Sequence, residues 1–518
     1  MIRSVELENF KAFRSLPSLE LGPLTILCGS NSCGKSSVLQ SLLLLKQTLE
    51  SQNPNQVLLV NGRLVHLGSM ADLVYGHEKP TNLSLEYVLP VSPGLLGQGG
   101  RSIPFNRFSR ELFPEISARV PGPQMRLKVV LSHRARRTHG NAFQPMAVEE
   151  LAVSTESVAA ENEPPIACSS VQLVRRGQTA DYDVTWHNLS AEFLSRGSST
   201  PKLWSGHGQL TTLSFSNIFP SRYGQFTVAE SSFSVPEQGL HMATYGIMTF
   251  LSAAKSYCTS LMSSLSYVGP LREEPARRYI YEDEVVDVGV KGENAAYIYL
   301  VEQDTTLDPI YSYDSETQTF VEKRKERLGS AVEEWLSSMG IRGLTPKGDK
   351  NGIISLLLES GASSRSSVNI ADVGFGVSQV FPIVVAGLRA RTGSCLLLEQ
   401  PEIHLHPGLQ MQLADYLLSL ALANKQIVVE THSDHLINRI VRRVVEDPTG
   451  NIAKLVRIYF VESSGSGSKV ELVKLDPDRG IVNWPRGFFD QTANEQALIM
   501  EAGIRKRRNT AGVGKRAT

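Results

Sequence analysis

Hydrophobic and polar positions near the start of the chain predict two strands, a helix and a hairpin. Ile2, Val5, Leu7 and Phe10 form a partly alternating pattern typical of a strand, and the apolar run LTILCG predicts a second, buried strand. After the loop at 29–36, the apolar-rich segment SVLQSLLLLKQTLE predicts a helix. In QVLLVNGRLVHLGSM, an Asn-Gly pair between two apolar runs predicts a β-hairpin.

The pattern then changes along the chain. Strand-like pieces such as MRLKVVLS alternate with loops rich in Gly, Ser and Pro, which predicts a mostly β insertion. A helical stretch follows, and strands then alternate with helices, as in GIISLLLES, CLLLEQ and KQIVVETHS, which is typical of a parallel sheet covered by helices. No sustained heptad pattern is present, so we expect no long coiled coil. The predicted parts are an α/β domain in two segments (1–80 and 353–475), a β-rich insertion (81–235), a helical arm or lever (236–352) and a C-terminal segment with a basic tail (476–518).

Charge and composition limit the kinds of partner and compartment. Lysine plus arginine number 52, as do aspartate plus glutamate, so the whole molecule supplies no field that would steer nucleic acid toward it. Nucleic acid would need a local patch; Arg134, Arg136 and Arg137 form the densest one in the insertion, although a solvated loop is the simpler interpretation. Five scattered cysteines lack metal-ligand spacing, and neither a signal peptide nor an apolar run of membrane-spanning length is present. We therefore expect a cytoplasmic protein with no membrane partner.

The stretch GSNSCGKS matches the phosphate-binding pattern G-x-x-x-x-G-K-[ST] in full and lies between a predicted strand and a predicted helix. In such a P-loop, small residues let the backbone wrap a phosphate, and the amides and the helix N-terminus present positive charge to it. Lys35 would reach the terminal phosphates, and Ser36 would offer its hydroxyl to Mg²⁺, so we expect ATP and Mg²⁺ as cofactors. The residues expected to contact the nucleotide here are Gly29, Ser30, Asn31, Ser32, Cys33, Gly34, Lys35, Ser36 and Ser37.

The carboxylate of Glu399 is a second candidate for the same site. The apolar strand in LLLEQPE delivers Glu399 to the carboxyl edge of the predicted sheet, where parallel α/β folds bind ligands. Because a P-loop lies upstream, we expect Glu399 to bind Mg²⁺ together with Ser36.

With the tail GIVNWPRGFFDQ, these motifs resemble the ABC-type ATPase heads of the RecF, SMC and OLD (overcoming lysogenization defect) group. The chain most closely resembles bacterial AAA-type ATPases with a W-P-x-G-F-F-D C-terminal domain of unknown function, some of whose relatives act in anti-phage defence. The resemblance covers residues 1–80 and about 265–500 and says little about 81–235. It implies an α/β P-loop NTPase fold of the ABC type, with a β-rich and helical insertion.

The resemblance also implies roles for further residues. DVGFGVSQV stands where such heads carry their signature motif, and Gly374, Gly376 and Ser378 would open a helix that faces the γ-phosphate bound by the opposite protomer. In VVETHSDH, His432 would reach the γ-phosphate or the attacking water. HLHP, which begins at His404, stands at the position of the D-loop, which lies between the two protomers in such heads.

Two further assignments stay open at the level of sequence. Arg272 is either a nucleotide or interface arginine or a structural partner of Glu273 or another neighbour. The glutamine of the Q-loop is unassigned among Gln40, Gln47 and Gln56.

Gln400 stands where related heads carry the glutamate that activates water. A neutral amide can orient water but cannot accept its proton, so general-base catalysis is lost at this position. In one interpretation ATP is held and hydrolysed slowly, and the ATP-clamped dimer is the working state. In the other, Glu402 or His432 accepts the proton. We expect a slow ATPase with the base unassigned, since Lys35, Mg²⁺ and the signature helix would still supply positioning and charge.

ATP between a P-loop and a signature motif requires two copies, so the resemblance implies a homodimer or a higher homo-oligomer. Three outputs are considered: a regulatory ATPase that gates a separately encoded nuclease or toxin in anti-phage defence, a DNA-repair head that clamps duplex DNA, and a scaffold with negligible hydrolysis. The stretch after His432 is shorter than a Toprim nuclease needs, so we expect nuclease chemistry, if any, in a partner.

Overall fold

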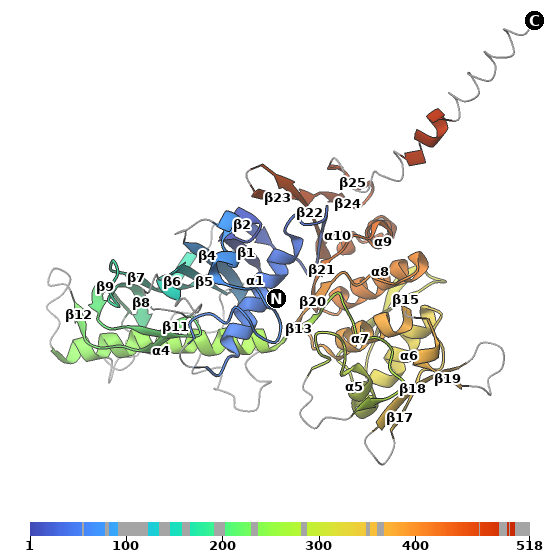
Figure 1. Ribbon diagram of the computed structural model, residues 1–518, viewed down its shortest axis with the longest axis horizontal. Helices are drawn as coiled ribbons and strands as arrows, with labels where there is room; N and C mark the ends of the chain where they lie inside the picture. The colour runs from blue at the N-terminus through green and yellow to red at the C-terminus, as the bar shows by residue number, and fades with distance from the viewer. Residues whose placement is uncertain are drawn as a thin grey trace, which may run out of the picture.

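Two β-sheets organise the chain, one on the left of Figure 1 and one near its centre. The computed structural model describes residues 1–53, 56–77, 82–91, 123–133, 146–157, 166–190, 203–228, 237–280, 287–348, 353–359, 367–374, 376–465, 467–485, 495–496 and 498–502.

The first sheet has nine strands in the order β12-β9-β8-β7-β6-β5-β4-β1-β2, and every neighbouring pair is antiparallel. Buried and partly exposed side chains alternate along its strands, as at Met125, Leu127, Val129 and Leu131, which are all buried. This alternation is the pattern of a sheet with one face on a core. The strands are β1 (Ser4–Phe10), β2 (Phe13–Glu20), β4 (Leu83–Pro90), β5 (Gln124–His133), β6 (Met146–Ser157), β7 (Ile166–Arg175), β8 (Tyr182–Ser190), β9 (Leu203–Leu210) and β12 (Phe226–Val228).

The predicted boundary at residue 80 falls inside this sheet. β4 belongs to the predicted insertion, yet it pairs with β1 from Ser4↔Val88 to Glu8↔Ser84. The strands predicted for 81–235 therefore extend the N-terminal sheet instead of forming a sheet of their own. Helix α4 (Glu237–Ser263) packs against β7, β8 and β12 of the same sheet and runs along its length (Figure 1).

The second sheet is mainly parallel and has the order β13-β20-β21-β3-β22-β23. All its neighbouring pairs are parallel except β22 and β23, which are antiparallel. Its inner strands are apolar and buried, as in CLLLE and QIVVE, because helices cover both faces. The parallel sheet expected from the alternation of strands and helices is confirmed. The strands are β13 (Leu265–Val268), β20 (Cys395–Glu399), β21 (Gln426–Glu430), β3 (Leu24–Gly29), β22 (Val456–Ser464) and β23 (Gly467–Val473).

Helices on the two faces of this sheet belong to two hydrophobic cores. Leu27 of β3 faces the core shared with the antiparallel sheet, whereas Leu24, Ile26 and Cys28 face the other core. The strand that leads into the P-loop is thus held from both sides. The helices around the sheet are α1 (Lys35–Leu49), α7 (Gly376–Arg389), α8 (Pro407–Leu422), α9 (Asp434–Glu446) and α10 (Asn451–Leu455).

The segment predicted as a helical arm is mixed. It includes β13 of the parallel sheet and several short elements that, with β18 and β19, form the lower right part of Figure 1. No long coiled coil is present in the described part of the chain, which agrees with the absence of heptads. The elements of this part are β14 (Tyr279–Ile280), α5 (Ala295–Glu302), β15 (Ile310–Asp314), β16 (Thr319–Lys323), α6 (Leu328–Ser338), β17 (Thr345–Gly348), β18 (Ile353–Glu359) and β19 (Ser367–Asn369).

The hairpin predicted for QVLLVNGRLVHLGSM is present only as a tight turn with one antiparallel bridge, between Asn61 and His66. Two backbone hydrogen bonds close it, from Gly62 to Val65 and from Leu67 to Val60. The pairing does not extend further, because the carbonyl oxygen of Leu59 accepts from the Gln47 side chain of α1, which also bonds Val65. Gln47 therefore has a structural role.

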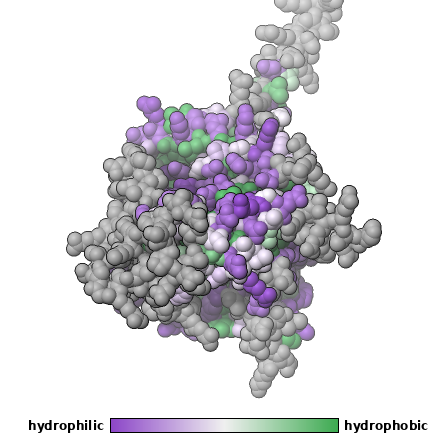
Figure 2. All heavy atoms as spheres, turned by 90° about the vertical axis from the view of Figure 1, so that its left-hand side faces the viewer, coloured by the Kyte–Doolittle hydropathy of each residue, from purple (hydrophilic) through white to green (hydrophobic). Residues whose placement is uncertain are grey.

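Short elements complete the description. They are α2 (Met70–Leu73), η1 (Tyr75–His77), β10 (Ser214–Ser216), β11 (Phe219–Arg222), η4 (Ile370–Asp372), β24 (Leu475–Asp476) and β25 (Gly480–Ile481). Figure 2 shows the free end of the antiparallel sheet, where the coloured surface is mainly hydrophilic with small separate hydrophobic areas. Among the described residues, no helix combines the length and the hydropathy needed to cross a membrane.

Candidate nucleotide site

The P-loop has the predicted position between β3 and α1. Both of its glycines are required, because no side chain would fit at either position. Gly29 has φ 140°, and a Cβ atom there would overlap the carbonyl oxygen of Val461 on β22. Gly34 has φ 97°, and its Cβ would clash with the side chain of Ala12. Both positions therefore exclude larger residues, and the loop is packed tightly against two neighbouring segments.

The ammonium group of Lys35 lies inside this loop. Its side chain is only 3% exposed, and Nζ donates to the carbonyl oxygens of Ser30 at 2.6 Å and Gly29 at 3.4 Å. The lysine and the amides at the start of α1 together give the loop a positive interior, which suits an anionic ligand.

Two carboxylates lie side by side at the carboxyl edge of the parallel sheet. Glu399 ends β20 and Glu430 ends β21, and the two residues are partners in the strand register. The hydroxyl of Ser36 donates to Glu430 Oε1 at 3.0 Å, whereas Glu399 Oε2 accepts from the Tyr267 hydroxyl at 2.7 Å. Ser36, predicted to share a cation with Glu399, thus contacts a different glutamate.

Burial raises the pKa of Glu430 to about 7, and the hydrogen bond from Ser36 opposes this rise. The neighbouring carboxylates Glu399 and Glu402 raise the pKa of Glu430 further, while Lys35 lowers it. The carboxyl groups are therefore close enough to repel one another. The charge of Lys35 opposes this repulsion at Glu430, and the charge of Arg272 does so at Glu402.

Neither Glu430 nor Tyr267 was predicted from the sequence. The signal for Glu430 was present, because an acidic residue directly follows the apolar strand QIVV, as Glu399 directly follows CLLL. Tyr267 had a weaker signal, since an aromatic residue within the buried strand LSYV is typical of a core.

The turn after Glu399 is held by Arg272. Gln400 has φ 45°, and its backbone N–H donates to the backbone carbonyl oxygen of Glu430. Arg272 is 7% exposed and donates to the carbonyl oxygens of Gln400 at 2.9 Å and Pro401 at 3.4 Å. Burial lowers the pKa of Arg272 to about 10, although the charge of Glu402 opposes this shift. These contacts support a positioning role for the arginine.

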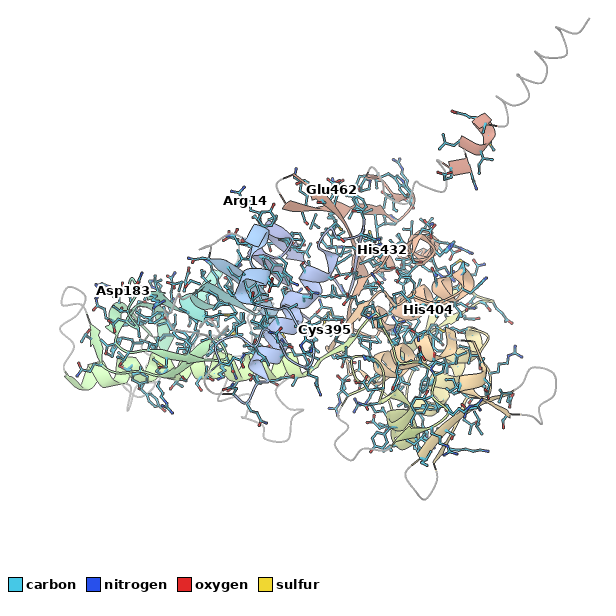
Figure 3. The ribbon with its side chains drawn as sticks, in the orientation of Figure 1. Arg14, Asp183, Cys395, His404, His432 and Glu462 are labelled. Atoms are coloured by element: carbon cyan, nitrogen blue, oxygen red, sulfur yellow. The ribbon has the colours of Figure 1, made fainter. Side chains whose placement is uncertain are left out.

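Glu402 and His432 are brought together beside the P-loop. The backbone amide of His432 donates to Glu402 Oε1 at 2.6 Å, and Glu402 is 9% exposed. Burial raises the pKa of Glu402, while burial and the charge of Lys35 lower the pKa of His432. In Figure 3, His432 lies above Cys395, which is the first residue of β20.

The signature residues form a second group. Gly376 begins α7, Ser378 is 6% exposed, and Phe375 between Gly374 and Gly376 lies outside the described residues. A Cβ atom on Gly376 would meet Leu409 and the carbonyl oxygen of His404. The start of the signature therefore lies against the HLHP loop and the beginning of α8.

A P-loop at a parallel strand, with carboxylates ending the next two strands of the sheet, is typical of the class of nucleoside-triphosphate-binding proteins. The model of the family described as AAA ATPase domain matches residues 1–87 and 301–437, the two segments that contain the P-loop and Glu399. A second family, described as Protein of unknown function (DUF3696), matches residues 453–498. No curated protein matches the sequence.

Solved structures of SMC heads resemble the chain only distantly. An SmcHead bound to the C-winged helix domain of ScpA is 12% identical with a TM-score of 0.38, over 92% of this chain and 98% of that one. The SMC head domain from Thermotoga maritima is 10% identical with a TM-score of 0.33, over 91% and 99%. A Pyrococcus furiosus Smc head with an extended coiled coil, bound to a ScpA domain, is 12% identical with a TM-score of 0.35, over 97% and 99%. Likenesses at these TM-scores assign neither a function nor a partner to this chain.

Proposed function

We propose that this protein binds ATP with Mg²⁺, closes around it as a homodimer, hydrolyses it slowly and thereby gates a separate effector protein. The observation that carries the proposal is the P-loop, in which Lys35 is buried and Ser36 is hydrogen-bonded to a carboxylate. The P-loop group holds Lys35, Ser36 and the carboxylates, and the signature group begins at Gly376, which lies against the HLHP loop. A second copy would bring the two groups together around each nucleotide.

The residues at the P-loop fit a magnesium ion. Glu430 Oε2 is a buried oxygen without a hydrogen-bond partner among the described residues, and the Ser36 hydroxyl lies beside Glu430. Oxygen donors of this kind are those that Mg²⁺ prefers. The bound ion would neutralise charge on the phosphates, while Lys35 and the loop amides would hold them.

Slow hydrolysis follows from Gln400, which cannot take a proton from water. We propose Glu402 as the acceptor, because its free oxygen lies in the same turn and its other oxygen is fixed by the His432 amide. Burial raises the pKa of Glu402, and a raised pKa makes its carboxylate a stronger proton acceptor.

Complementation between two inactive variants tests the shared site. Lys35→Ala removes the P-loop cation and Ser378→Arg blocks the signature group, so each homodimer should be inactive. In a mixture, half of the dimers are mixed, and each mixed dimer has one intact site. We expect the mixture to recover about a quarter of the wild-type phosphate release.

The outcome that contradicts a shared site is a mixture as inactive as its components, although both variants fold and exchange protomers with the wild type. Sedimentation with and without a non-hydrolysable ATP analogue gives a second readout. A wild-type chain that binds the analogue and stays monomeric would exclude the dimer while leaving the ATPase intact.

A role in anti-phage defence belongs to this proposal and rests on the resemblance of the tail GIVNWPRGFFDQ. Trp484 of that tail is 59% exposed, a position that a partner protein could reach, while Phe488 and Phe489 lie outside the described residues. Co-purification with the products of adjacent reading frames tests the effector. The arginine patch at Arg134, considered for DNA, also lies outside the described residues, so we propose no second function.

A further inference from the structure

Glu430 has a side chain that the surrounding protein uses only in part. It lies on an inner strand of the parallel sheet and is 3% exposed. One oxygen, Oε1, accepts from Ser36, whereas Oε2 is buried and has no hydrogen-bond partner among the described residues. A buried carboxylate oxygen without a donor is costly, so such an oxygen in a native fold requires an explanation.

The surroundings of Glu430 exclude a simple structural explanation. Its nearest charged neighbours include two further carboxylates, Glu399 and Glu402, and a single ammonium, Lys35, which is bonded to loop carbonyls. In the described structure no arginine or lysine forms an ion pair with Glu430. Carboxylates that crowd one another in this way are stabilised when a divalent cation lies between their oxygens.

Glu399 and Glu430 each accept one hydroxyl, but they differ in burial and in the hydroxyl that they hold. Glu399, the residue that the sequence pattern assigns to the cation, is only partly buried and accepts the Tyr267 hydroxyl on Oε2. Glu430 keeps one oxygen open and holds the hydroxyl of Ser36, the other group assigned to the cation. Ser36 therefore points at Glu430, and a cation bound by that hydroxyl lies within reach of the same glutamate.

We infer that Glu430 is a direct ligand of the divalent cation that accompanies the bound triphosphate, next to the hydroxyl of Ser36. The inference rests on the proposed binding of ATP at the P-loop. In the absence of nucleotide, the hydrogen bond from Ser36 occupies one oxygen of Glu430. With a cation bound, the Ser36 hydroxyl would keep its proton and bind the ion through its oxygen, and the Glu430 carboxylate would bind the ion instead of accepting that hydrogen bond.

The test measures cation binding in the full chain and does not depend on turnover. Mn²⁺ serves as the probe, and its free concentration is followed by electron paramagnetic resonance in the presence of saturating non-hydrolysable ATP analogue. Wild type is compared with Glu430→Gln, which has nearly the same shape, and with Glu333→Gln, an exposed control on α6. Binding of the analogue in EDTA is measured for each protein.

We expect Glu430→Gln to weaken Mn²⁺ binding to the nucleotide complex by about tenfold or more, since outer and inner partners of metal sites contribute factors of this size. Binding of the analogue in EDTA should stay within about twofold, and Glu333→Gln should match the wild type in both measurements. Mn²⁺ affinity within about twofold of wild type in Glu430→Gln would overturn the inference.

The two proposals fail in different ways. If the wild type does not bind the analogue in EDTA or with Mn²⁺, the proposed ATP site fails and Glu430 fails with it. If the analogue binds and only the effect of Glu430→Gln is missing, the ATP site stands and the ligand assignment is wrong. If Glu430→Gln does not fold, Glu430→Asp replaces it, because aspartate keeps the charge on a shorter side chain. If Glu430 is a ligand, Glu430→Asp should bind Mn²⁺ more weakly, while its binding of the analogue in EDTA should be unchanged.

Discussion

The molecule has two clusters of buried charged residues, one between helices α8 and α9 and one at the P-loop. Both contain arginine or lysine with carboxylates, but they differ in whether their polar atoms have hydrogen-bond partners. In the first, Asp415 is 4% exposed and both its oxygens accept from Arg439 and Arg443. Arg443 also donates to Glu446 and to the Tyr313 hydroxyl, and its guanidinium lies 3.6 Å from the centroid of that ring. Every charge of this helix cluster has a partner in contact.

The P-loop cluster leaves polar atoms open. Glu402 Oε2, Glu430 Oε2 and Arg272 Nε are buried and have no hydrogen-bond partner among the described residues. Buried polar atoms without partners are unfavourable in a folded protein. A cluster whose polar atoms all have partners within the chain (a closed cluster) therefore indicates a structural role, and a cluster with unpartnered atoms (an open cluster) indicates a ligand from outside.

The difference between the two clusters gives four predictions, from the largest expected effect to the smallest.

Lys35→Ala should abolish the function of the open cluster without unfolding the protein. Among the described residues Nζ donates to loop carbonyls and the Cys33 sulfur and forms no ion pair, so its removal breaks no salt bridge. We expect ATP hydrolysis to fall by at least about 100-fold, since one oriented charge at a phosphate contributes that much. Phosphate release and a thermal melt measure the two effects, and Lys347→Ala on the surface is the control. An active Lys35→Ala protein would contradict the assignment of the P-loop.

Asp415→Ala should have the reverse effect, because it removes the shared acceptor of two arginines in the closed cluster. Breaking a buried ion pair by removing one partner costs about 3–5 kcal/mol of unfolding free energy. Urea unfolding measures this loss, and ATP binding per folded molecule should remain unchanged. If Asp415→Ala lost nucleotide binding while remaining stable, the distinction between structural and functional clusters would be wrong.

Glu402→Gln separates binding from hydrolysis within the open cluster. The amide can still accept from the His432 backbone, so the turn should keep its shape. Loss of a proton acceptor predicts a fall in kcat of about 100-fold with little change in ATP affinity. Single-turnover kinetics measure the chemical step directly. A normal rate in Glu402→Gln combined with a slow His432→Ala would assign the proton to His432 instead.

Lys425 lies outside both clusters and has the smallest effect near neutral pH, because its titration changes stability only at higher pH. It is 1% exposed, donates to the carbonyl oxygens of Gly387 and Leu388, and has only Asp308 as a charged neighbour among the described residues. Burial lowers the pKa of Lys425 to about 8 from 10.5. Between these values the unfolded chain holds a proton that the folded chain lacks, so stability rises with pH by up to about 1.4 kcal/mol per unit.

Urea unfolding of wild type and Lys425→Met across this pH range checks the effect of Lys425. The unfolding free energy of wild type relative to the variant should increase from about pH 8 to about pH 10.5 and stay level below that range. Parallel curves for the two proteins throughout the range would show that Lys425 does not titrate there.

The sequence predicts the P-loop and the parallel sheet because both depend on local patterns. GSNSCGKS has fixed spacing, and apolar runs such as CLLLE and QIVVE identify buried strands one by one. The pairing of β4 with β1 joins segments far apart in the chain, and no local period encodes such a pairing. The shortness of the hairpin at Asn61 has the same cause, because its backbone is bonded to the side chain of Gln47, which belongs to α1.

In the candidate site, too, contacts between segments far apart in the sequence could not be predicted. Glu399, Glu402 and His432 are found by motif, whereas the tie between Ser36 and Glu430 becomes visible only when two parallel strands are placed side by side. Arg272 could be a ligand or a structural residue until its carbonyl partners were known. Motifs identify the chemistry of a residue, but burial and unpaired atoms show which residues await a partner.

Helix α4 gives the antiparallel sheet a mechanical route to the ATP site. Its 27 residues make a rod of about 40 Å, and the chain passes from its end at Ser263 almost directly into β13. Tyr267 of that strand holds Glu399 by one hydrogen bond. A force applied to the remote end of α4 would therefore reach the hydrogen bond between Tyr267 and Glu399, although its point of action is far from the P-loop.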